Sequence, residues 1–253
     1  MTTYVLVHGG GTTGRFWDRT VAVLDRLDPH GRALAFDLPG RGEHPADLGT
    51  VTVEDEVASV VADVRAAAPD GPVVLVAHSS GGLVVPGVAE ALAPQVRAIV
   101  LVAALVPPEG GDGVDCMQPR HAAGLRAAAA SLGPDDPPIT LPGPPEDPEP
   151  FRSSTGGEPL DDDTLAFVVD PVRSVPDGVH HYFQPVRWSQ VGPEVPVTYL
   201  LTLHDRPIPA DLQREMVERL PRPARVVELP AGHLAPITHP DPVTEHVVGA
   251  VHG

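Results

Sequence analysis

One serine of the sequence lies where an apolar strand should turn sharply into a helix. Residues 73–77 form an apolar, β-branched run, Ser79 follows it closely, and glycines then open a helical pattern. A serine at such a turn directs its hydroxyl into the crevice at the carboxyl edge of a sheet, where the N-terminus of the next helix faces it. The turn needs small residues two positions before and two after the serine, and Ala77 and Gly81 supply them. We therefore predict that Ser79 is a nucleophile; an ordinary strand-to-helix turn with an N-capping serine is the alternative.

A serine hydroxyl is a weak nucleophile near neutral pH and needs a neighbouring base, a role that suits histidine because its ordinary pKa is about 6.5. Among the 12 histidines, His233 stands between the last predicted strand and the last predicted helix, in a loop that should lie above Ser79. Asp205 comes just after the preceding strand, where its carboxylate can hold the imidazole in the right tautomer. Ser79, Asp205 and His233 therefore predict acyl transfer through a serine nucleophile.

Other serines, histidines and acids are weaker candidates for these roles. Ser80 lacks a small residue two positions before it, because His78 stands there. The side chain of His78 should itself point away from Ser79, and we expect a structural role for His8. Asp37 opens an Asp-Leu-Pro-Gly sequence, which favours a structural turn that ties two loops together. No group of histidines has a convincing metal-ligand spacing, so we expect no metal site.

A glycine-rich turn follows the first predicted strand, in the sequence His-Gly-Gly-Gly at residues 8–11. Acyl transfer builds negative charge on the former carbonyl oxygen, and two preorganised backbone N–H groups can stabilise that charge in a dry site. Glycine lets the backbone approach the substrate closely. We expect the two donors to be the N–H groups of Gly10 and of Ser80, the residue after the nucleophile.

The same turn is open to a second interpretation, as a dinucleotide-binding loop. That motif requires three glycines in a fixed spacing at the start of a helix, with an acidic residue about 20 positions later. The histidine before the glycines and the serine turn downstream favour the first interpretation, which requires no cofactor. The residues that match the dinucleotide motif loosely are Gly9, Gly11 and Gly14, with Asp37 at the end of the next predicted strand.

These residues can meet only on a scaffold that brings several loops to one edge of a sheet. Short β-branched runs alternate with amphipathic stretches along the chain, which predicts right-handed βαβ units. The runs are apolar almost throughout, as expected for parallel strands buried on both faces. We therefore expect an α/β fold with a mostly parallel, doubly wound sheet. The predicted strands span 4–8, 33–37, 73–77, 98–104, 197–202 and 226–229, and the predicted helices 16–27, 53–68, 81–92, 211–220 and 242–251.

Residues 107–193 break this alternation and contain no clear strand. Their middle, 134–150, is crowded with prolines and acids, which a regular helix or a central strand does not accept. We interpret 107–193 as a lid with a proline-rich loop, inserted into a core formed by 1–106 and 194–253; a disordered surface insertion is the alternative. Candidates for the walls of a pocket, with core packing as the alternative for the aromatic residues, are Phe16, Trp17, His180, His181, Phe183 and Trp188.

The combined motifs resemble the α/β-hydrolase superfamily over nearly the whole chain. The resemblance is closest to the short group that contains plant methyl esterases and hydroxynitrile lyases, with their bacterial relatives. It implies the α/β-hydrolase fold, and the chain order Ser79, Asp205, His233 is the order of the catalytic triad in that fold. The matching segments are 7–10 with 16–17, 37–42, 78–82, 204–209 and 232–234.

Three positions sort the activities of this group. Its hydroxynitrile lyases carry Thr after the first His and Lys after the catalytic His, whereas this sequence has Gly9 and Leu234 there. Epoxide hydrolases and haloalkane dehalogenases use an Asp nucleophile, in contrast to Ser79. The resemblance implies a serine hydrolase that cleaves a small or medium apolar carboxylic ester or lactone through an acyl-enzyme. The alternatives are a cofactor-free lyase or cyclase that uses the Ser-His pair for acid–base chemistry, and a ligand-binding protein with a retained triad.

The amino-acid composition limits the classes of partner that the protein can bind. Among 253 residues, 34 Asp and Glu stand against 17 Lys and Arg, and this formal net charge of -17 repels polyanions, so we expect no nucleic-acid partner. Cys116 is the single cysteine and cannot form an internal disulfide. The longest apolar run, 98–108, is too short to span a bilayer, and the N-terminus lacks the basic region of a signal peptide. We expect a cytoplasmic protein with a small-molecule substrate, without membrane contact, and leave a homodimer open.

Overall fold

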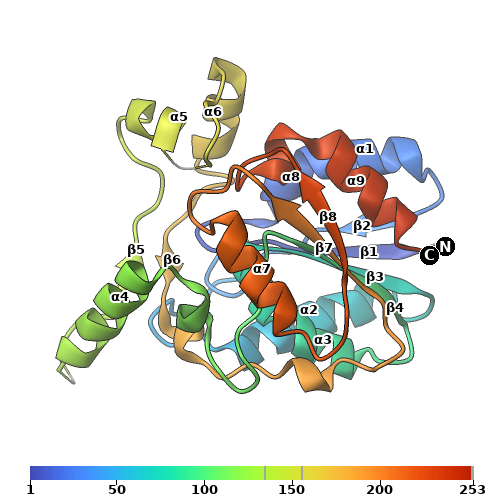
Figure 1. The fold of residues 1–253 in the computed structure, drawn as a ribbon, viewed down its shortest axis with the longest axis horizontal. Helices are drawn as coiled ribbons and strands as arrows, with labels where there is room; N and C mark the ends of the chain where they lie inside the picture. The colour runs from blue at the N-terminus through green and yellow to red at the C-terminus, as the bar shows by residue number, and fades with distance from the viewer. Residues whose placement is uncertain (134, 155, 252–253) are drawn as a thin grey trace.

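Six parallel strands form the central sheet of the computed structural model, which describes residues 1–133, 135–154 and 156–251 (Figure 1). The strand order is β2-β1-β3-β4-β7-β8, and every pair in this sheet is parallel. The order reverses beside β1, as in doubly wound folds, so loops from β1, β3, β7 and β8 gather at one edge. The strands are β1 (Thr3–Val7), β2 (Arg32–Leu34), β3 (Val73–His78), β4 (Val96–Val102), β7 (Val197–Thr202) and β8 (Arg225–Leu229).

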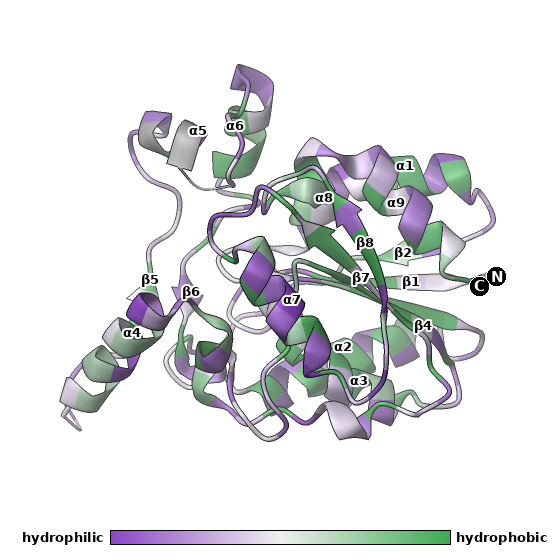
Figure 2. Ribbon diagram, viewed as in Figure 1, coloured by the Kyte–Doolittle hydropathy of each residue, from purple (hydrophilic) through white to green (hydrophobic). Residues whose placement is uncertain are grey.

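Side chains of the central strands alternate between two hydrophobic cores, one on each face of the sheet. In β3, Leu75 packs with the core that contains helices α2 (Val53–Ala67), α3 (Val85–Ala91) and α7 (Ala210–Glu218). Val76, the next residue, packs with the core that contains α1 (Asp18–Leu27), α8 (Ala235–Thr238) and α9 (Pro240–Gly249). Burial on both faces explains why the strands are apolar at successive positions. Figure 2 shows this apolar character along β4 and β7 and a mixture of polar and apolar residues on α7.

The predicted elements are present, with shifted boundaries where the chain turns. β2 ends at Leu34 although the prediction reached residue 37, because β2 is an edge strand that pairs only with Thr3–Val5 of β1. The helix predicted at 81–92 is a 3-10 turn over Ser79–Leu83 followed by α3, whose N-terminus carries a proline. The helix predicted at 16–27 similarly begins as a 3-10 turn, Gly14–Trp17.

Between β4 and β7, the described residues form three α-helices and a small second sheet. The helices are α4 (Pro119–Ser131), α5 (Glu149–Ser154) and α6 (Asp162–Val169), which lie to one side of the central sheet in Figure 1. Antiparallel strands β5 (Thr140–Leu141) and β6 (Asp177–Gly178) pair with each other. The sequence shows no clear strand in 107–193, and the structure corrects this with β5 and β6. Two-residue strands are too short to show any periodicity in the sequence, and these pair across 35 intervening residues.

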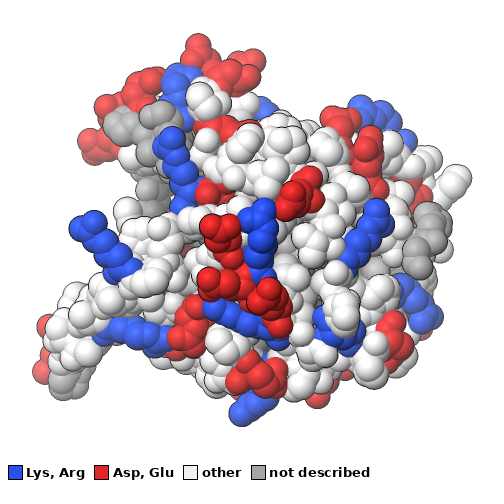
Figure 3. All heavy atoms as spheres, in the orientation of Figure 1, with Lys and Arg blue, Asp and Glu red and all other residues white. Residues whose placement is uncertain are grey.

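The surface carries acidic and basic side chains close together on the face shown in Figure 3. On α7, for example, Arg214 contacts both Asp211 and Glu228 at 2.8 Å. These pairs are solvent-exposed, so each contributes little to stability. No described helix has the length and apolar character that crossing a membrane requires.

Candidate active site

Ser79 follows directly after β3 and has a left-handed backbone, with φ at 52°. This conformation is strained for a residue with a side chain, and such strain is typical of a nucleophile held on a sharp turn. Close backbone approaches surround it: a Cβ added to Gly81 would lie 2.7 Å from the carbonyl oxygens of Val7 and His8. A Cβ added to Gly9 would lie 2.8 Å from the Ser79 Cβ. The small residues around Ser79 are therefore required by packing.

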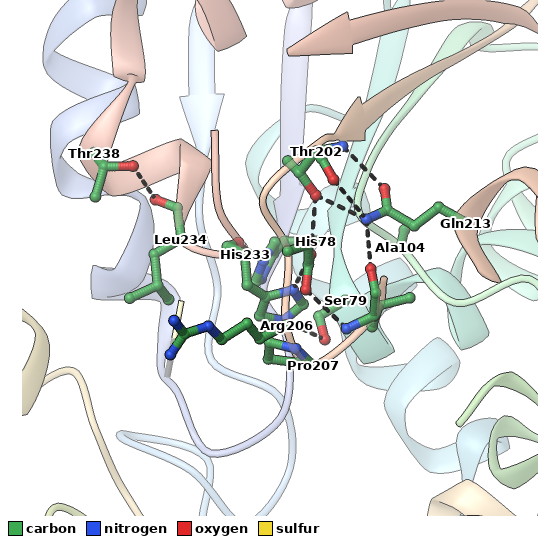
Figure 4. A network of polar contacts seen from close by, with 12 residues as sticks. His78, Ser79, Ala104, Thr202, Arg206, Pro207, Gln213, His233, Leu234 and Thr238 are labelled. Atoms are coloured by element: carbon green, nitrogen blue, oxygen red, sulfur yellow. Dashed lines mark hydrogen bonds and ion pairs between the residues drawn. The ribbon is translucent and has the colours of Figure 1, made fainter. Parts of the chain in front are cut away.

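His233 lies after β8, in a loop that is held on two sides. Its backbone N–H donates to the Gly156 carbonyl at 2.7 Å, and its own carbonyl accepts a hydrogen bond from Nε2 of His78 at 2.8 Å. This loop brings Nε2 of His233 to 3.2 Å from Oγ of Ser79 (Figure 4). The distance is within reach of a direct proton transfer between serine and imidazole.

Asp205 completes this arrangement behind His233. Its Oδ2 lies 2.7 Å from Nδ1 of His233, and the side chain is fully buried. Two further donors fix the carboxylate: Thr202 Oγ1 donates to Oδ2 at 2.9 Å, and the Ile208 N–H donates to Oδ1 at 2.8 Å. A buried carboxylate is stable only with such partners. The structure therefore brings Ser79, His233 and Asp205 into one hydrogen-bonded line.

Gln213 on α7 supports Asp205 from behind, a role that the sequence did not reveal. Its Oε1 accepts from the Thr202 N–H at 3.0 Å, and its Nε2 donates to Oγ1 of Thr202 at 2.9 Å and to the Ile208 carbonyl at 2.7 Å (Figure 4). Both Thr202 and Ile208 are donors to Asp205. Gln213 is completely buried, and every polar atom of its amide has a partner. Only its burial in the structure reveals this supporting role, because glutamine on an amphipathic helix is normally a surface residue.

His78 and His8 have structural positions around this line. Burial, followed by the nearby charge of His233, lowers the pKa of His78 well below its ordinary value, so the ring stays neutral and donates from Nε2. Burial, followed by the charge of Arg41, lowers the pKa of His8 to about 4. The neutral His8 donates from Nδ1 to the Gly9 carbonyl at 2.9 Å and accepts from the Leu38 N–H at Nε2. His8 thus fixes the glycine-rich turn, as its predicted structural role requires.

Asp37 ties two loops together, as predicted. Its Oδ1 accepts from the Gly14 N–H at 2.8 Å, and its Oδ2 accepts from the Glu43 N–H at 2.9 Å. The carboxylate therefore joins the turn after β1 to the loop after β2. Neither contact involves Ser79 or His233.

A cavity of about 270 Å³ opens above Ser79 and His233, and Gly10 lies in its wall. The proline-rich loop supplies one side, and α6 residues Val168 and Val169 supply another. The apolar residues that the sequence offered as walls are mostly elsewhere: Phe16 lines the cavity, whereas Trp17 and Trp188 are buried in the two cores. His180, His181 and Phe183 are likewise outside the cavity wall, which corrects those expectations. The loop residues in the wall are Leu141, Pro142, Gly143, Pro144 and Pro145.

A second, more open cavity has a volume of about 500 Å³. It is lined by Glu158, His204 and His239, among others, and excludes Ser79. Among the described residues, no cluster of three or more histidines, cysteines or acids has the arrangement of a metal site. Of these two cavities, only the one above Ser79 is lined by Ser79 and His233.

Comparison with known proteins places this arrangement in a family. A family model described as "Alpha/beta hydrolase family" matches residues 4–246. The chain belongs to the α/β-hydrolase family. This membership confirms the predicted fold, and it favours the serine-turn interpretation of the glycine-rich loop over dinucleotide binding.

Relatives of this α/β-hydrolase include bacterial and plant esterases. The carbendazim hydrolyzing esterase of Nocardioides sp. (strain SG-4G) is 37% identical over 121 residues, which cover 47% of this chain and 48% of that enzyme. Probable esterase PIR7A of Oryza sativa subsp. indica is 41% identical over 108 residues, which cover 42% of this chain and 40% of the rice protein. The chain thus spans about half or less of the length of these two relatives. They confirm the resemblance to plant esterases and their bacterial relatives.

A solved structure confirms the fold over 99% of the chain. An extracellular α/β-hydrolase from a Paenibacillus species, described as homologous to tobacco salicylic acid binding protein 2, superimposes with a TM-score of 0.80. The alignment covers 99% of this α/β-hydrolase and 99% of the Paenibacillus chain at 23% sequence identity.

Proposed function

We propose that this α/β-hydrolase is a serine esterase that cleaves a small or medium apolar carboxylic ester or lactone through an acyl-enzyme. The observation that carries the proposal is the line of hydrogen bonds from Oγ of Ser79 to Nε2 of His233, at 3.2 Å, and from Nδ1 of His233 to Asp205, at 2.7 Å. This line begins at the floor of a largely apolar cavity. A nucleophile, a base and an acid that orients the base are the groups that ester cleavage requires.

In the proposed reaction, Oγ of Ser79 attacks the ester carbonyl carbon while Nε2 of His233 takes the serine proton. The N–H groups of Gly10 and Ser80 hydrogen-bond the oxygen that becomes negative. The tetrahedral intermediate expels the alkoxide, which takes the proton from His233 and leaves as the alcohol. Water then attacks the acyl-Ser79 carbonyl with His233 as base, releases the carboxylic acid and restores the serine. Asp205 holds the imidazole and stabilises its protonated form in both halves of the reaction.

We further propose that segment 107–193 is a lid on the core formed by 1–106 and 194–253. Its proline-rich loop and α6 contribute to the wall above Ser79. A cavity of about 270 Å³ is at the small end of ligand sites, which supports a small or medium substrate. Half of the residues in its wall are valine, leucine, isoleucine, proline or phenylalanine, which supports an apolar acyl or alcohol group.

The relatives named as esterases support this chemistry over the lyase and cyclase alternatives. Leu234, in the position where hydroxynitrile lyases of the group carry Lys, lines the cavity and offers no proton. A ligand-binding protein with a retained triad would show the same geometry without turnover. A cytoplasmic location and a homodimer stay predictions from the sequence.

Trapping of the acyl-enzyme tests the proposal. The protein is mixed with p-nitrophenyl butyrate, and with a fluorophosphonate in a separate sample, and each adduct is located by mass spectrometry after digestion. We expect turnover of the ester, a butyryl group on Ser79 in acid-quenched samples, and stoichiometric phosphonylation of Ser79. Absence of both adducts at Ser79 would overturn the proposal, and phosphonylation without ester turnover would favour the ligand-binding alternative.

A further inference from the structure

Asp177, in strand β6, is a buried carboxylate directly behind the glycine-rich turn. Its side chain is completely shielded from solvent, and its two oxygens have different partners. Oδ2 accepts a hydrogen bond from the Gly11 N–H at 3.0 Å, whereas Oδ1 accepts from Nε and Nη2 of Arg41. One carboxylate from segment 107–193 therefore joins the turn after β1 to an arginine of the core.

Space around Gly10 is limited by the same segment. A Cβ added to Gly10 would lie 2.7 Å from Oδ2 of Asp177 and 2.4 Å from the Tyr182 hydroxyl. Gly11 has a φ of 67°, a left-handed conformation that leaves its N–H directed at Asp177. Two side chains from a part of the chain more than 160 residues away therefore pack closely against Gly10, and one of them accepts a hydrogen bond from the next residue, Gly11.

Arg41 is itself enclosed and held from a second side. Its Nη1 contacts Oε1 of Glu56 at 2.8 Å, and both side chains are 1% exposed. Glu56 belongs to α2 and contacts Arg41, not the glycine-rich turn. A buried ion network tolerates little movement, because separating its charges leaves them unpaired in a medium of low dielectric constant. Asp177 therefore has one well-defined position.

We infer that Asp177 is a positioning residue that directs the Gly10 N–H toward the oxyanion of the ester reaction. This inference rests on the proposed function, because it assigns Asp177 to the same reaction. Oxyanion stabilisation requires donors within about 2.7–3.1 Å of the developing charge, so a small shift of the turn weakens it. Asp177 does not line the cavity among the described residues, so we expect its replacement to change kcat more than KM.

Asp177→Asn separates the two roles of the carboxylate, which are to pair with Arg41 and to accept a hydrogen bond from the Gly11 N–H. The amide has one oxygen, and the charged Arg41 competes for it more strongly than the neutral Gly11 N–H does. The amide NH2 group then faces the Gly11 N–H, two donors that repel each other, and the turn moves. Glu56→Gln is the matched control, since it removes a buried carboxylate from the same Arg41 without touching the turn.

Both variants are compared with wild type on p-nitrophenyl butyrate, with active sites counted by fluorophosphonate titration. For Asp177→Asn we expect kcat per active site to fall about tenfold or more, with KM within about twofold. An alkyl trifluoromethyl ketone, which forms a tetrahedral adduct with serine, should bind more weakly by a similar factor. Glu56→Gln should keep kcat within about threefold of wild type. Equal kcat values for the two variants, or a change in KM alone, would overturn the inference.

If Asp177→Asn does not fold, the inference can be tested in a variant that lacks the charges of both Arg41 and Glu56. In Arg41→Met/Glu56→Gln no buried charge competes for the amide oxygen, so adding Asp177→Asn leaves that oxygen free to accept from Gly11. Adding Asp177→Leu to the same background removes the acceptor. We expect kcat to be about tenfold higher with Asn than with Leu, and equal values would overturn the inference. Wild type reports the proposed function separately: if it lacks Ser79 labelling and turnover, the esterase proposal is wrong, whatever the variants show.

Discussion

Nε2 of His78 donates a hydrogen bond to the backbone carbonyl of His233 at 2.8 Å, so the residue before the proposed nucleophile holds the loop of the proposed base. The two rings are 4.7 Å apart, and His78 also stacks on Phe16 with centroids 4.7 Å apart. The distance from Ser79 to His233 is therefore fixed also through His78, the residue next to Ser79, and not only through the triad itself.

Replacing His78 by phenylalanine tests this support. His78→Phe keeps an aromatic ring against Phe16 but leaves the His233 carbonyl without its donor, which costs about 1–3 kcal/mol for a buried acceptor. We expect a lower melting temperature and a loss of about tenfold in turnover per active site. Thermal unfolding and titrated kinetics measure the two effects, with Phe16→Leu as a control that alters the stack and spares the hydrogen bond. Wild-type turnover in His78→Phe would show that the loop needs no such support.

Ser79→Ala removes the proposed nucleophile. Turnover of p-nitrophenyl butyrate should fall by several orders of magnitude, because no acyl-enzyme can form. The protein should still fold, with a melting temperature within a few degrees of wild type, since one half-buried hydroxyl is lost and the backbone is unchanged. Ser80→Ala is the neighbouring control, and it keeps the backbone N–H that we assign to the oxyanion. Activity of Ser79→Ala within about tenfold of wild type would disprove the assignment.

Two aspartates should respond oppositely to the same substitution. Asp205→Asn places an amide where His233 needs an acceptor, and turnover should fall by about 10³–10⁴-fold, as in serine proteases with the equivalent change. Asp37→Asn weakens contacts to two backbone N–H groups, those of Gly14 and Glu43, and should cost about 1–2 kcal/mol of stability with turnover nearly intact. Turnover and denaturant unfolding are measured for both. Near-wild-type turnover in Asp205→Asn would place the acid elsewhere.

Stability should fall in acid because His8 and His78 are buried as neutral rings. Their pKa values are lower in the folded protein than in the unfolded chain, to about 4 for His8. The unfolded chain therefore binds more protons below about pH 6.5, and stability is present above that pH and lost as the pH falls toward 4. Each histidine contributes a slope of up to about 1.4 kcal/mol per pH unit in that range.

Urea unfolding between pH 4.5 and 7.5 measures this slope. His78→Phe should reduce it by the contribution of one group, whereas replacement of an exposed histidine such as His30 by glutamine should leave it unchanged. An identical slope in wild type and His78→Phe would mean that the His78 ring gains a proton in the folded protein.

The central sheet and the three residues of the proposed triad were predictable because each has a local signal. Parallel strands buried on both faces are continuous apolar runs, and loops at their carboxyl ends carry Ser79, Asp205 and His233. The observed ends of some elements differ from the predicted ones where tertiary structure overrides the local preference of the sequence for strand or helix. One example is β2, which lies at the sheet edge and ends earlier than predicted.

Gln213 and Asp177 escaped prediction because their partners are distant and their neighbours in sequence are uninformative. A glutamine on an amphipathic helix and an aspartate in a polar loop are ordinary surface residues by pattern. What makes them important is burial, which depends on α7 lying under the Asp205 loop and on β6 lying under the glycine-rich turn. Apart from Phe16, the apolar residues of the cavity wall were missed for the same reason, because the proline-rich loop has no periodicity that fixes its direction.

Helix α4 contributes no buried residue along its 13 positions. An isolated helix of this length is marginal in water, so α4 depends on a few polar contacts and on the partly buried Ala122 and Leu125, which pack against one hydrophobic core. Arg126 contacts Asp112 and Asp115 at 2.8 Å, and Gln118 donates to the Arg206 carbonyl at 2.9 Å. Its amide protons should therefore exchange with solvent long before those of β3 and β4. The outward face of α4 is a place where an affinity tag or a surface-immobilisation residue can be introduced without disturbing either hydrophobic core.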